Sequence, residues 1–393
     1  MEIAHFEALL APHGREVLDA AMESDVSEKG LLATASRLRS RYPAELVGAA
    51  LGQVRLRARA AAKFGPDAAR MYFTPQGLEQ STRASVAAYR AARFAGLSGP
   101  VLELCCGIGA DLLFRARAGV AGTGVDRDPL TVAVASANLA AFGVSGLAKA
   151  RVGDALDQDP SGHAAVFVDP GRRTGRGRVF DPRAYEPPLD ALLDLASRAP
   201  AGCVKVAPGI PYEAIPEGAS TEWISDGGDV KEAALWLGDL ADGPARRATL
   251  LRGGEVHSLT PDPAFSVPEV RPWGRYLYEP DGAVIRAHLV GEAAALVDGG
   301  LADPRIAYIT SDVLKDTPFT SSYEIQEVLP FSVKRLKAAL RARGVGTLTL
   351  KKRGFAADLD RLHRDLRPSG PSAGTVVLTR VGDSPFALLC AKR

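Results

Sequence analysis

The sequence predicts an α/β protein in which a mostly parallel sheet lies between an N-terminal helical region and a small C-terminal α/β unit. Three observations support this fold class. Apolar residues recur at helical spacing through residues 1–97, and short apolar runs alternate with helical patterns through residues 98–255. Residues 319–393 repeat that alternation on a smaller scale. At 393 residues, the chain is long enough for two or three domains.

The N-terminal region, residues 1–97, is predicted to be helical. EALLAPHGREVLDAAM and PAELVGAALGQVRLRARAAAKFG both show the helical repeat, and Pro43 can occupy the first turn of the second helix. We expect Ser81 or Thr82 to cap a third helix, RASVAAYRAARFAGL, which ends at the Gly99–Pro100 breaker.

Residues 98–255 show the pattern of βαβ units, which predicts a parallel sheet. A helix is expected at about residues 230–240. The predicted strands are Val101–Leu104, Thr123–Asp126, Lys149–Val152, Ala165–Val168, Cys203–Val206, Thr221–Ser225 and Ala248–Arg252.

The last third of the chain is predicted as a connecting region and a small α/β unit. Residues 256–318 begin Pro-rich and continue into one helical stretch, AVIRAHLVGEAAALV. In residues 319–393 we expect strands at YEIQEVL, GTLTLKKR, TVVLTR and FALLCAK, and helices at SVKRLKAALRAR and AADLDRLHRDL.

The composition is that of a globular protein, with 46% hydrophobic and 24% charged residues. It excludes wholesale disorder and collagen. No apolar run approaches the ~18 residues that span a bilayer, and the N-terminus does not resemble a secretory signal. The 4 cysteines are too few for a disulfide scaffold, so we expect a reducing, cytoplasmic location.

Charge is distributed unevenly along the chain. Residues 331–393 hold 14 Lys and Arg against 4 Asp and Glu, whereas the whole chain has a net charge of only +2. A basic terminal block on an otherwise acidic chain favours a polyanionic partner, although a merely solvated basic surface would give the same count.

The most informative stretch is VLELCCGIGADLLFRARAGVAGTGVD. An apolar strand ends near Glu103, a loop with Gly107 and Gly109 follows, and a helix begins at about Ala110. Glycines allow the backbone to approach a ligand closely, and a helix N-terminus presents free N–H groups. A dinucleotide site would need a third glycine where Leu112 stands, and Glu103 would repel a pyrophosphate.

Acidic residues follow the next two strands. Asp126 can accept both hydroxyls of a ribose, and Asp154 can meet an adenine amino group. Together with Glu103 and the glycine loop, this combination resembles the class I S-adenosylmethionine-dependent methyltransferases over about residues 98–255. The departure from the usual first glycine, at Cys105, also occurs in RNA-modifying branches of that family. The resemblance implies a Rossmann-like sheet, with S-adenosylmethionine contacted by Glu103, Cys105, Gly107, Gly109, Asp111, Asp126, Arg127, Asp154 and Ala155.

The segment after the fourth strand, VFVDPGRRTGRGRVFDPRAY, faces the methyl acceptor in that family. Asp169 is therefore expected to orient the acceptor, with Pro170 fixing the turn. The segment also resembles the Asp-Pro-Pro-Arg of RNA 5-methyluridine enzymes. Those enzymes use a cysteine after the fifth strand, where this chain has Ala207 and Pro208, so covalent pyrimidine chemistry is not expected.

Arginines crowd the same segment, and arginine forks suit phosphate groups. Over most of its length the chain resembles a bacterial family of predicted methyltransferases with a THUMP-like domain at the C-terminus. THUMP domains bind RNA, usually tRNA, which implies structured RNA as partner and substrate. The residues expected to contact it are Arg172, Arg173, Arg176, Lys351, Lys352 and Arg353.

Other interpretations stay open at this stage. The loop could belong to a dehydrogenase-type Rossmann domain or could have no function. The acceptor could be a small molecule or a protein, and the chain could bind cofactor and RNA without turnover. The four cysteines and 6 histidines show no metal-ligand spacing, so no metal is expected.

Overall fold

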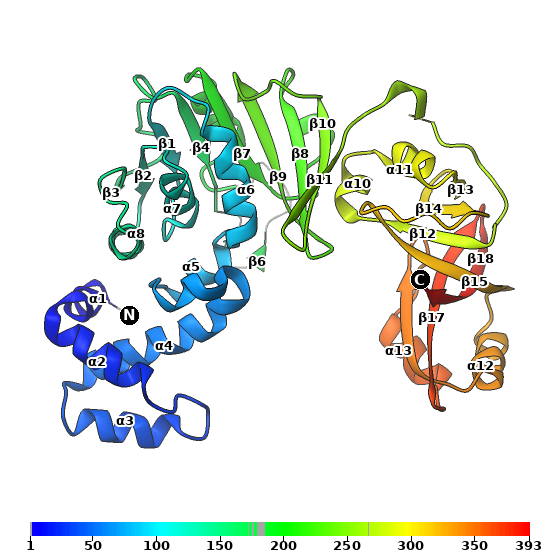
Figure 1. Cartoon of the computed structure of the whole chain (residues 1–393), viewed down its shortest axis with the longest axis horizontal. Coiled ribbons are helices and arrows are strands. Elements are labelled where there is room, and N and C mark those ends of the chain that lie inside the picture. Colours follow the sequence, from blue (N-terminus) through cyan, green and yellow to red (C-terminus); the bar gives the residue numbers. More distant parts are fainter. Residues whose placement is uncertain (1, 172, 175–176, 179–184, 266) are drawn as a thin grey trace. The chain divides into compact units, whose positions relative to one another are not determined.

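The computed structural model describes residues 2–171, 173–174, 177–178, 185–265 and 267–393. The chain divides into two compact units (Figure 1). The first unit runs to Thr221 and includes Glu232–Ala245, and the second combines Glu222–Lys231 with Arg246–Arg393. None of the helices in the described residues is long and apolar enough to cross a membrane.

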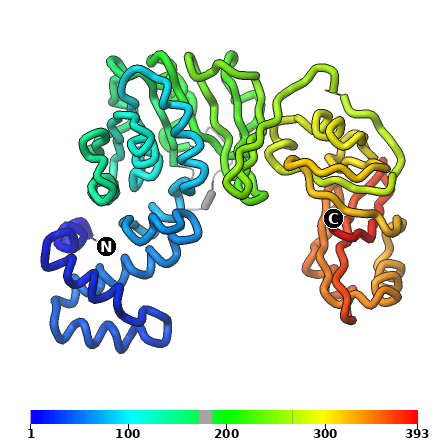
Figure 2. The backbone as a smooth tube through the Cα atoms, viewed as in Figure 1, coloured from blue at the N-terminus to red at the C-terminus, as the bar shows by residue number. Residues whose placement is uncertain are grey.

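The N-terminal region is helical, as expected. Its first predicted helix is divided in two, because Ala11 precedes Pro12 and adopts an extended conformation that ends the first helix. Figure 2 shows this helical region leading directly into the first strand of the sheet. The helices are α1 (Ile3–Leu10), α2 (Pro12–Met22), α3 (Leu31–Arg39), α4 (Ala44–Phe64), α5 (Pro75–Gln80) and α6 (Ala84–Phe94), with a 3₁₀ turn at Gly65–Ala69.

The expected cap of α6 is wrong. Arg83 occupies the N-cap position without a side-chain hydrogen bond. The Thr82 hydroxyl instead donates to the carboxylate of Asp111, at 2.7 Å. Thr82, which the local sequence predicted as a helix cap, therefore forms a hydrogen bond with a buried carboxylate instead.

A nine-stranded sheet follows, in the order β11-β10-β8-β9-β7-β4-β1-β2-β3. The pairings among β3, β2, β1, β4 and β7 are parallel, and β9 is antiparallel to β7. All seven predicted strands are present. The strands are β1 (Val101–Leu104), β2 (Gly122–Asp126), β3 (Ala148–Val152), β4 (Ala165–Val168), β7 (Ala201–Val206), β8 (Ser220–Asp226), β9 (Asp229–Gly238), β10 (Arg246–Arg252) and β11 (Glu255–Leu259).

The helix expected at residues 230–240 is wrong, because this segment is strand β9. Gly227 and Gly228, both with positive φ, form the tight turn that leads back from β8. Ala233, Ala234 and Leu235 are then buried in the sheet, and Trp236 is fully buried. Sheet pairing and burial therefore override the helix propensity of Glu, Ala and Leu.

Connecting helices complete this part of the fold: α7 (Ala110–Arg117), α8 (Pro129–Ala141) and α9 (Leu189–Ala196). The N-terminal helices share a hydrophobic core with α7, α8 and β3. Phe6, Phe73 and Leu113 are fully buried in that one cluster. The helical region is therefore packed onto the sheet domain as part of a common core.

The C-terminal sheet has seven strands in the order β13-β14-β12-β15-β18-β17-β16. It joins strands from the predicted connecting region to those of residues 319–393. The expected helix AVIRAHLVGEAAALV is two short helices, because His288 adopts a φ of 54° between them. The elements are β12 (Tyr276–Pro280), α10 (Gly282–Arg286), α11 (Val290–Leu296), β13 (Gly300–Asp303), β14 (Ile306–Ser311), β15 (Thr320–Pro330), α12 (Val333–Ala342), β16 (Val345–Lys352), α13 (Leu359–Leu366), β17 (Ser372–Val381) and β18 (Ser384–Lys392).

Candidate active site

The loop between β1 and α7 has three residues in the left-handed region: Cys105, Gly107 and Gly109, with φ of 58°, 55° and 74°. Glycine adopts this conformation without steric cost, whereas Cys105 adopts it at a cost that comes from its Cβ. Gly109 is the N-cap of α7, and a Cβ there would lie 3.0 Å from that of Ala135. The loop therefore needs small residues both for its turn and for its packing.

The carboxyl ends of the parallel strands meet beside this loop and enclose a cavity of about 470 Å³. Most of the predicted site residues line it, although they lie at or after the ends of four different strands and, for Asp111, on α7. The predicted residues on its wall are Cys105, Gly107, Asp111, Asp126, Arg127, Asp154, Ala155, Asp169 and Pro170. The structure thus brings the expected cofactor residues and the expected acceptor residue to one cavity.

Asp126 and Asp154 have their carboxylates fixed by backbone amides. The amides of Gly107 and Asp128 donate to Asp126 at 2.9 and 3.0 Å. The amide of Leu156 donates to Asp154 at 2.9 Å. Because each carboxylate oxygen has a second lone pair, both side chains keep acceptor capacity toward the cavity.

The described lining residues are strongly acidic. They include seven carboxylates, of which Glu79, Asp128 and Glu186 were not among the predicted residues. Arg127 is the one cation among them, and it lies 3.7 Å from the carboxylate of Glu186. This charge balance suits a ligand with cationic groups and disfavours a pyrophosphate.

Glu103 does not line the cavity, although we expected it beside the cofactor. Its side chain is buried beneath the loop and forms an ion pair with Arg115 of α7. Burial raises the pKa of Glu103 to about 7, even though Arg115 opposes that shift. Gly109 is likewise not on the cavity wall and acts at the start of α7.

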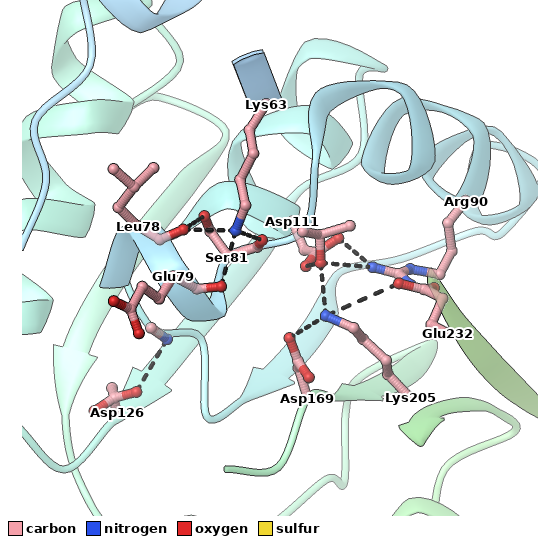
Figure 3. A network of polar contacts seen from close by, with 12 residues as sticks. Lys63, Leu78, Glu79, Ser81, Arg90, Asp111, Asp126, Asp169, Lys205 and Glu232 are labelled. Carbon is pink, nitrogen blue, oxygen red and sulfur yellow. Dashed lines mark hydrogen bonds and ion pairs between the residues drawn. The ribbon is translucent and has the colours of Figure 1, made fainter. Parts of the chain in front are cut away.

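A buried ion-pair network lies next to the cavity (Figure 3). The guanidinium of Arg90, on α6, pairs with Asp111 and with Glu232 of β9, and all three side chains are almost fully buried. Burial alone would raise the pKa of Asp111, but the neighbouring Arg90 and Lys205 lower it to about 2. Asp111 is therefore ionised at neutral pH.

Lys205 connects this network to the expected acceptor residue. Its ammonium nitrogen lies 2.6 Å from a carboxylate oxygen of Asp169 and 2.7 Å from the hydroxyl of Thr82. Glu232 is a weaker partner at 3.9 Å. Lys205 was not predicted as a site residue. The sequence shows only that a single lysine interrupts the apolar run CVKVAP, which does not indicate what the lysine contacts.

The cysteines near the site are poor nucleophiles. Burial, together with the nearby Asp126 and Asp169, raises the pKa of Cys105 to about 12. The pKa of Cys106 is also raised well above its usual value by burial. Cys203, on β7, is buried in the same hydrophobic cluster as Trp236. Because the thiolate is the reactive form, this geometry provides no activated thiol.

The arginine-rich segment can be placed only in part. Arg172 and Arg176, two of the predicted RNA contacts, lie outside the described residues. The backbone of Arg173 forms a short antiparallel pair with that of Arg178. Among the described residues, no group of three or more His, Cys, Asp or Glu could hold a metal ion.

In the second unit, the predicted basic run is engaged within its own fold. Lys351 lies 2.6 Å from Glu279 and its ammonium stacks over the ring of Tyr323. Arg353 lies 4.0 Å from Glu279 and stacks over Tyr308. Lys352 donates to the carbonyl of Ala357. Lys351 and Arg353 are therefore half-buried and paired within the unit, whereas Lys352 is exposed.

Comparison with known proteins agrees with this fold. Residues 320–392 match the family model described as THUMP domain-like, and residues 2–60 match a domain of unknown function. A solved structure from Porphyromonas gingivalis, assigned as a methyltransferase, superposes with a TM-score of 0.72 at 22% identity. That match covers 90% of this chain and 92% of the other.

The sheet and its acidic cavity thus define a methyltransferase of the Rossmann-like class. Two proteins from two strains of Mycobacterium tuberculosis, described as uncharacterized S-adenosylmethionine-dependent methyltransferases, are 39% identical over 339 residues. The match covers 83% of this chain and 91% of theirs. The chain belongs to this family of S-adenosylmethionine-dependent methyltransferases, with a THUMP-like domain at its C-terminus.

Proposed function

We propose that this methyltransferase modifies a base in structured RNA, such as tRNA or rRNA, and that its acceptor enters the cavity beside Asp169. The observation that carries the proposal is the combination of an acidic cofactor-type cavity with a basic THUMP-like unit. The unit spans residues 320–392, and the block of residues 331–393 carries 14 Lys and Arg against 4 Asp and Glu. Such a charge excess favours a phosphate backbone.

The cavity residues fit the cofactor. S-adenosylmethionine supplies a methyl group activated by its sulfonium, and its cationic groups suit a wall of seven carboxylates. In this proposal Asp126 accepts the ribose hydroxyls and Asp154 accepts from the adenine amino group. Gly107, Cys105, Asp111, Arg127 and Ala155 complete the site. Glu103 would act indirectly, by holding Arg115 and α7 beneath the loop.

On the acceptor side, Asp169 is the proposed orienting residue, with Pro170 fixing its turn. Lys205 holds one oxygen of the Asp169 carboxylate, which leaves the other to accept a proton from the acceptor. A group held in this way contributes to catalysis mainly by positioning. No thiol participates, in keeping with the raised pKa of Cys105.

RNA would be bound by exposed basic side chains of the THUMP-like unit, assisted by the arginines of residues 172–176. Lys334, Arg335 and Arg341 on α12, with Arg364 on α13, are exposed. We assign the main phosphate contacts to these residues rather than to Lys351–Arg353, whose side chains have partners within the unit. The division of the chain into an N-terminal helical region (1–97), a catalytic domain (98–255), a connecting region (256–318) and a THUMP-like domain (319–393) stays a prediction.

Tritium transfer tests the proposal directly. Labelled S-adenosylmethionine is incubated with the full chain and RNA from a strain that lacks the gene, with Asp169→Ala as the control. We expect label in RNA for the wild-type protein alone. Label in protein or in small molecules instead would support a different acceptor class. Cofactor binding without any transfer would support an RNA-binding protein without turnover.

A further inference from the structure

We propose that helix α5 and the residue after it form one wall of the cofactor site, so that the N-terminal helical region is part of the methyl-donor site. The inference rests on the proposed placement of the cofactor in the acidic cavity, but it does not depend on the identity of the methyl acceptor. No sequence motif pointed to this segment, since it precedes the glycine loop by about 25 residues.

The first observation is the position of α5 on the cavity wall. Gln76, Gly77, Glu79, Gln80 and Ser81 line the same cavity as Asp126 and Asp169. The side chains of Gln76 and Gln80 are exposed, and so is that of Glu79. Amide groups can both donate and accept, so this wall offers partners for an amino-acid carboxylate and for an ammonium.

The second observation is a close approach between α5 and the glycine loop. A Cβ added to Gly77 would lie 2.3 Å from the Cγ2 of Ile108 and 2.8 Å from the hydroxyl oxygen of Thr74. Ile108 is buried and lies between Gly107 and Gly109. Only a glycine therefore lets α5 pack directly against the loop that forms the other side of the cavity.

The third observation is that a side chain from another helix holds α5 in place (Figure 3). The ammonium of Lys63, in the last turn of α4, donates to the carbonyls of Leu78, Glu79 and Ser81 at 2.6, 2.8 and 3.0 Å. The last carbonyls of a helix lack intrahelical partners, and a cation is favoured there. Lys63 therefore fixes the end of α5 although it is not among the cavity-lining residues.

The segment is also fixed at both of its ends. The Thr74 hydroxyl accepts from the amide of Gly77 at 2.9 Å and caps the start of α5. Beyond its end, Thr82 donates to Asp111 and accepts from Lys205, both at 2.7 Å. The wall is thus tied to the loop, to α7 and, through Lys205, to Asp169.

Hydrogen–deuterium exchange on the full chain tests the inference without any substitution. S-adenosylhomocysteine, the demethylated product, is the probe. We expect it to slow amide exchange in peptides covering residues 75–82 as well as residues 105–111. Slower exchange at 105–111 with unchanged exchange at 75–82 would overturn the inference alone. Unchanged exchange in both segments would overturn the placement of the cofactor in this cavity, and the inference with it.

Matched glycine variants provide a second test by calorimetry. Gly77→Ala should weaken S-adenosylhomocysteine binding at least tenfold, because the added methyl group separates α5 from Ile108. Gly48→Ala is the control, since a Cβ there meets nothing within 4 Å. A folded Gly77→Ala protein with wild-type affinity would contradict the proposal.

A matched lysine pair keeps the test decisive if Gly77→Ala does not fold. Lys63→Met removes the cation from the end of α5, whereas Lys29→Met removes an exposed lysine of the same region. We expect several-fold weaker binding for the first and no change for the second. Equal affinities of the Lys63→Met and Lys29→Met proteins, together with wild-type exchange at residues 75–82, would contradict the proposal that α5 forms a wall of the cofactor site.

Discussion

The ammonium of Lys205 lies 2.6 Å from the carboxylate of Asp169, and both groups come from the carboxyl-terminal parts of neighbouring parallel strands. Lys205 is only 4% exposed, so it holds the acceptor-side carboxylate in an environment that water screens weakly. This ion pair links the proposed acceptor position to the buried cluster of Arg90, Asp111 and Glu232.

The first prediction concerns this pair. Asp169→Ala and Lys205→Met should each reduce methyl transfer to RNA by about 10²-fold, the lower range for a positioned acid–base group. Cofactor affinity, measured by calorimetry, should stay within a few fold. Lys205→Arg keeps the charge and should recover part of the activity. If Asp169→Ala retains turnover and loses cofactor binding, Asp169 belongs to the cofactor side of the cavity.

The second prediction concerns the ribose site. Asp126→Ala removes a carboxylate that two backbone amides hold toward the cavity. Hydrogen bonds to a charged group are worth ~1.5–3 kcal/mol, so S-adenosylmethionine should bind at least tenfold more weakly. Asp157→Ala, an exposed aspartate that is not among the lining residues, should bind normally. Unchanged affinity in a folded Asp126→Ala protein would reject the cofactor placement.

The third prediction concerns stability. Arg90→Met removes the cation that pairs directly with the buried Asp111 and Glu232 and leaves only the more distant Lys205, and breaking such a cluster costs about 3–5 kcal/mol. Arg198→Met removes an exposed ion pair with Asp194 and should cost at most about 1 kcal/mol. Urea unfolding of both variants measures the difference. Similar losses would mean that the buried cluster is dispensable for folding.

The fourth prediction concerns pH. The pKa of Glu103 is raised from 4.5 to about 7, so between these pH values the native protein binds more protons than the unfolded chain. The stability contributed by this group is therefore lost as the pH rises through that window, by at most about 3 kcal/mol. Glu103→Gln should abolish this loss, and exposed Glu28→Gln should retain it. Parallel stability curves for Glu103→Gln and wild type from pH 4.5 to 7 would contradict the prediction.

The fifth prediction separates two sets of basic residues. Lys334, Arg335 and Arg341 are exposed on α12, so changing all three to Ala should weaken RNA binding and flatten its dependence on salt. Lys351, Lys352 and Arg353 have partners within the unit, so their triple Ala variant should lose thermal stability instead. Filter binding at two salt concentrations, with melting curves, distinguishes them. A 351–353 variant that is stable but binds RNA more weakly would show that Lys351, Lys352 and Arg353 do contact RNA.

Much of the sheet could be predicted from sequence because its strands are short apolar runs bounded by turn residues. The ends of those strands led to Asp126, Asp154 and Asp169, which the structure brings to one cavity. Strand β9 was missed because its residues favour a helix in isolation, and only pairing with β7 and burial make them a strand.

The remaining site residues depend on tertiary packing that leaves no local pattern. Gly77 is near the cavity only because α5 packs against the glycine loop, and Lys63 acts there only because α4 lies beside the end of α5. Glu103 shows the converse case. Its position at the strand end predicted a ligand contact. In the structure, however, the Glu103 carboxylate forms an ion pair with Arg115, on the following helix α7.

The shared core that buries both Phe6 and Ala148 has a consequence for biosynthesis. When the helical segment leaves the ribosome, its own helices cover part of its apolar face, and the rest is covered only after α7, α8 and β3 have been translated. The nascent chain must therefore keep this surface from aggregating over more than a hundred residues of elongation. Expression of the sheet domain alone would expose the complementary surface, so the two parts should be produced together.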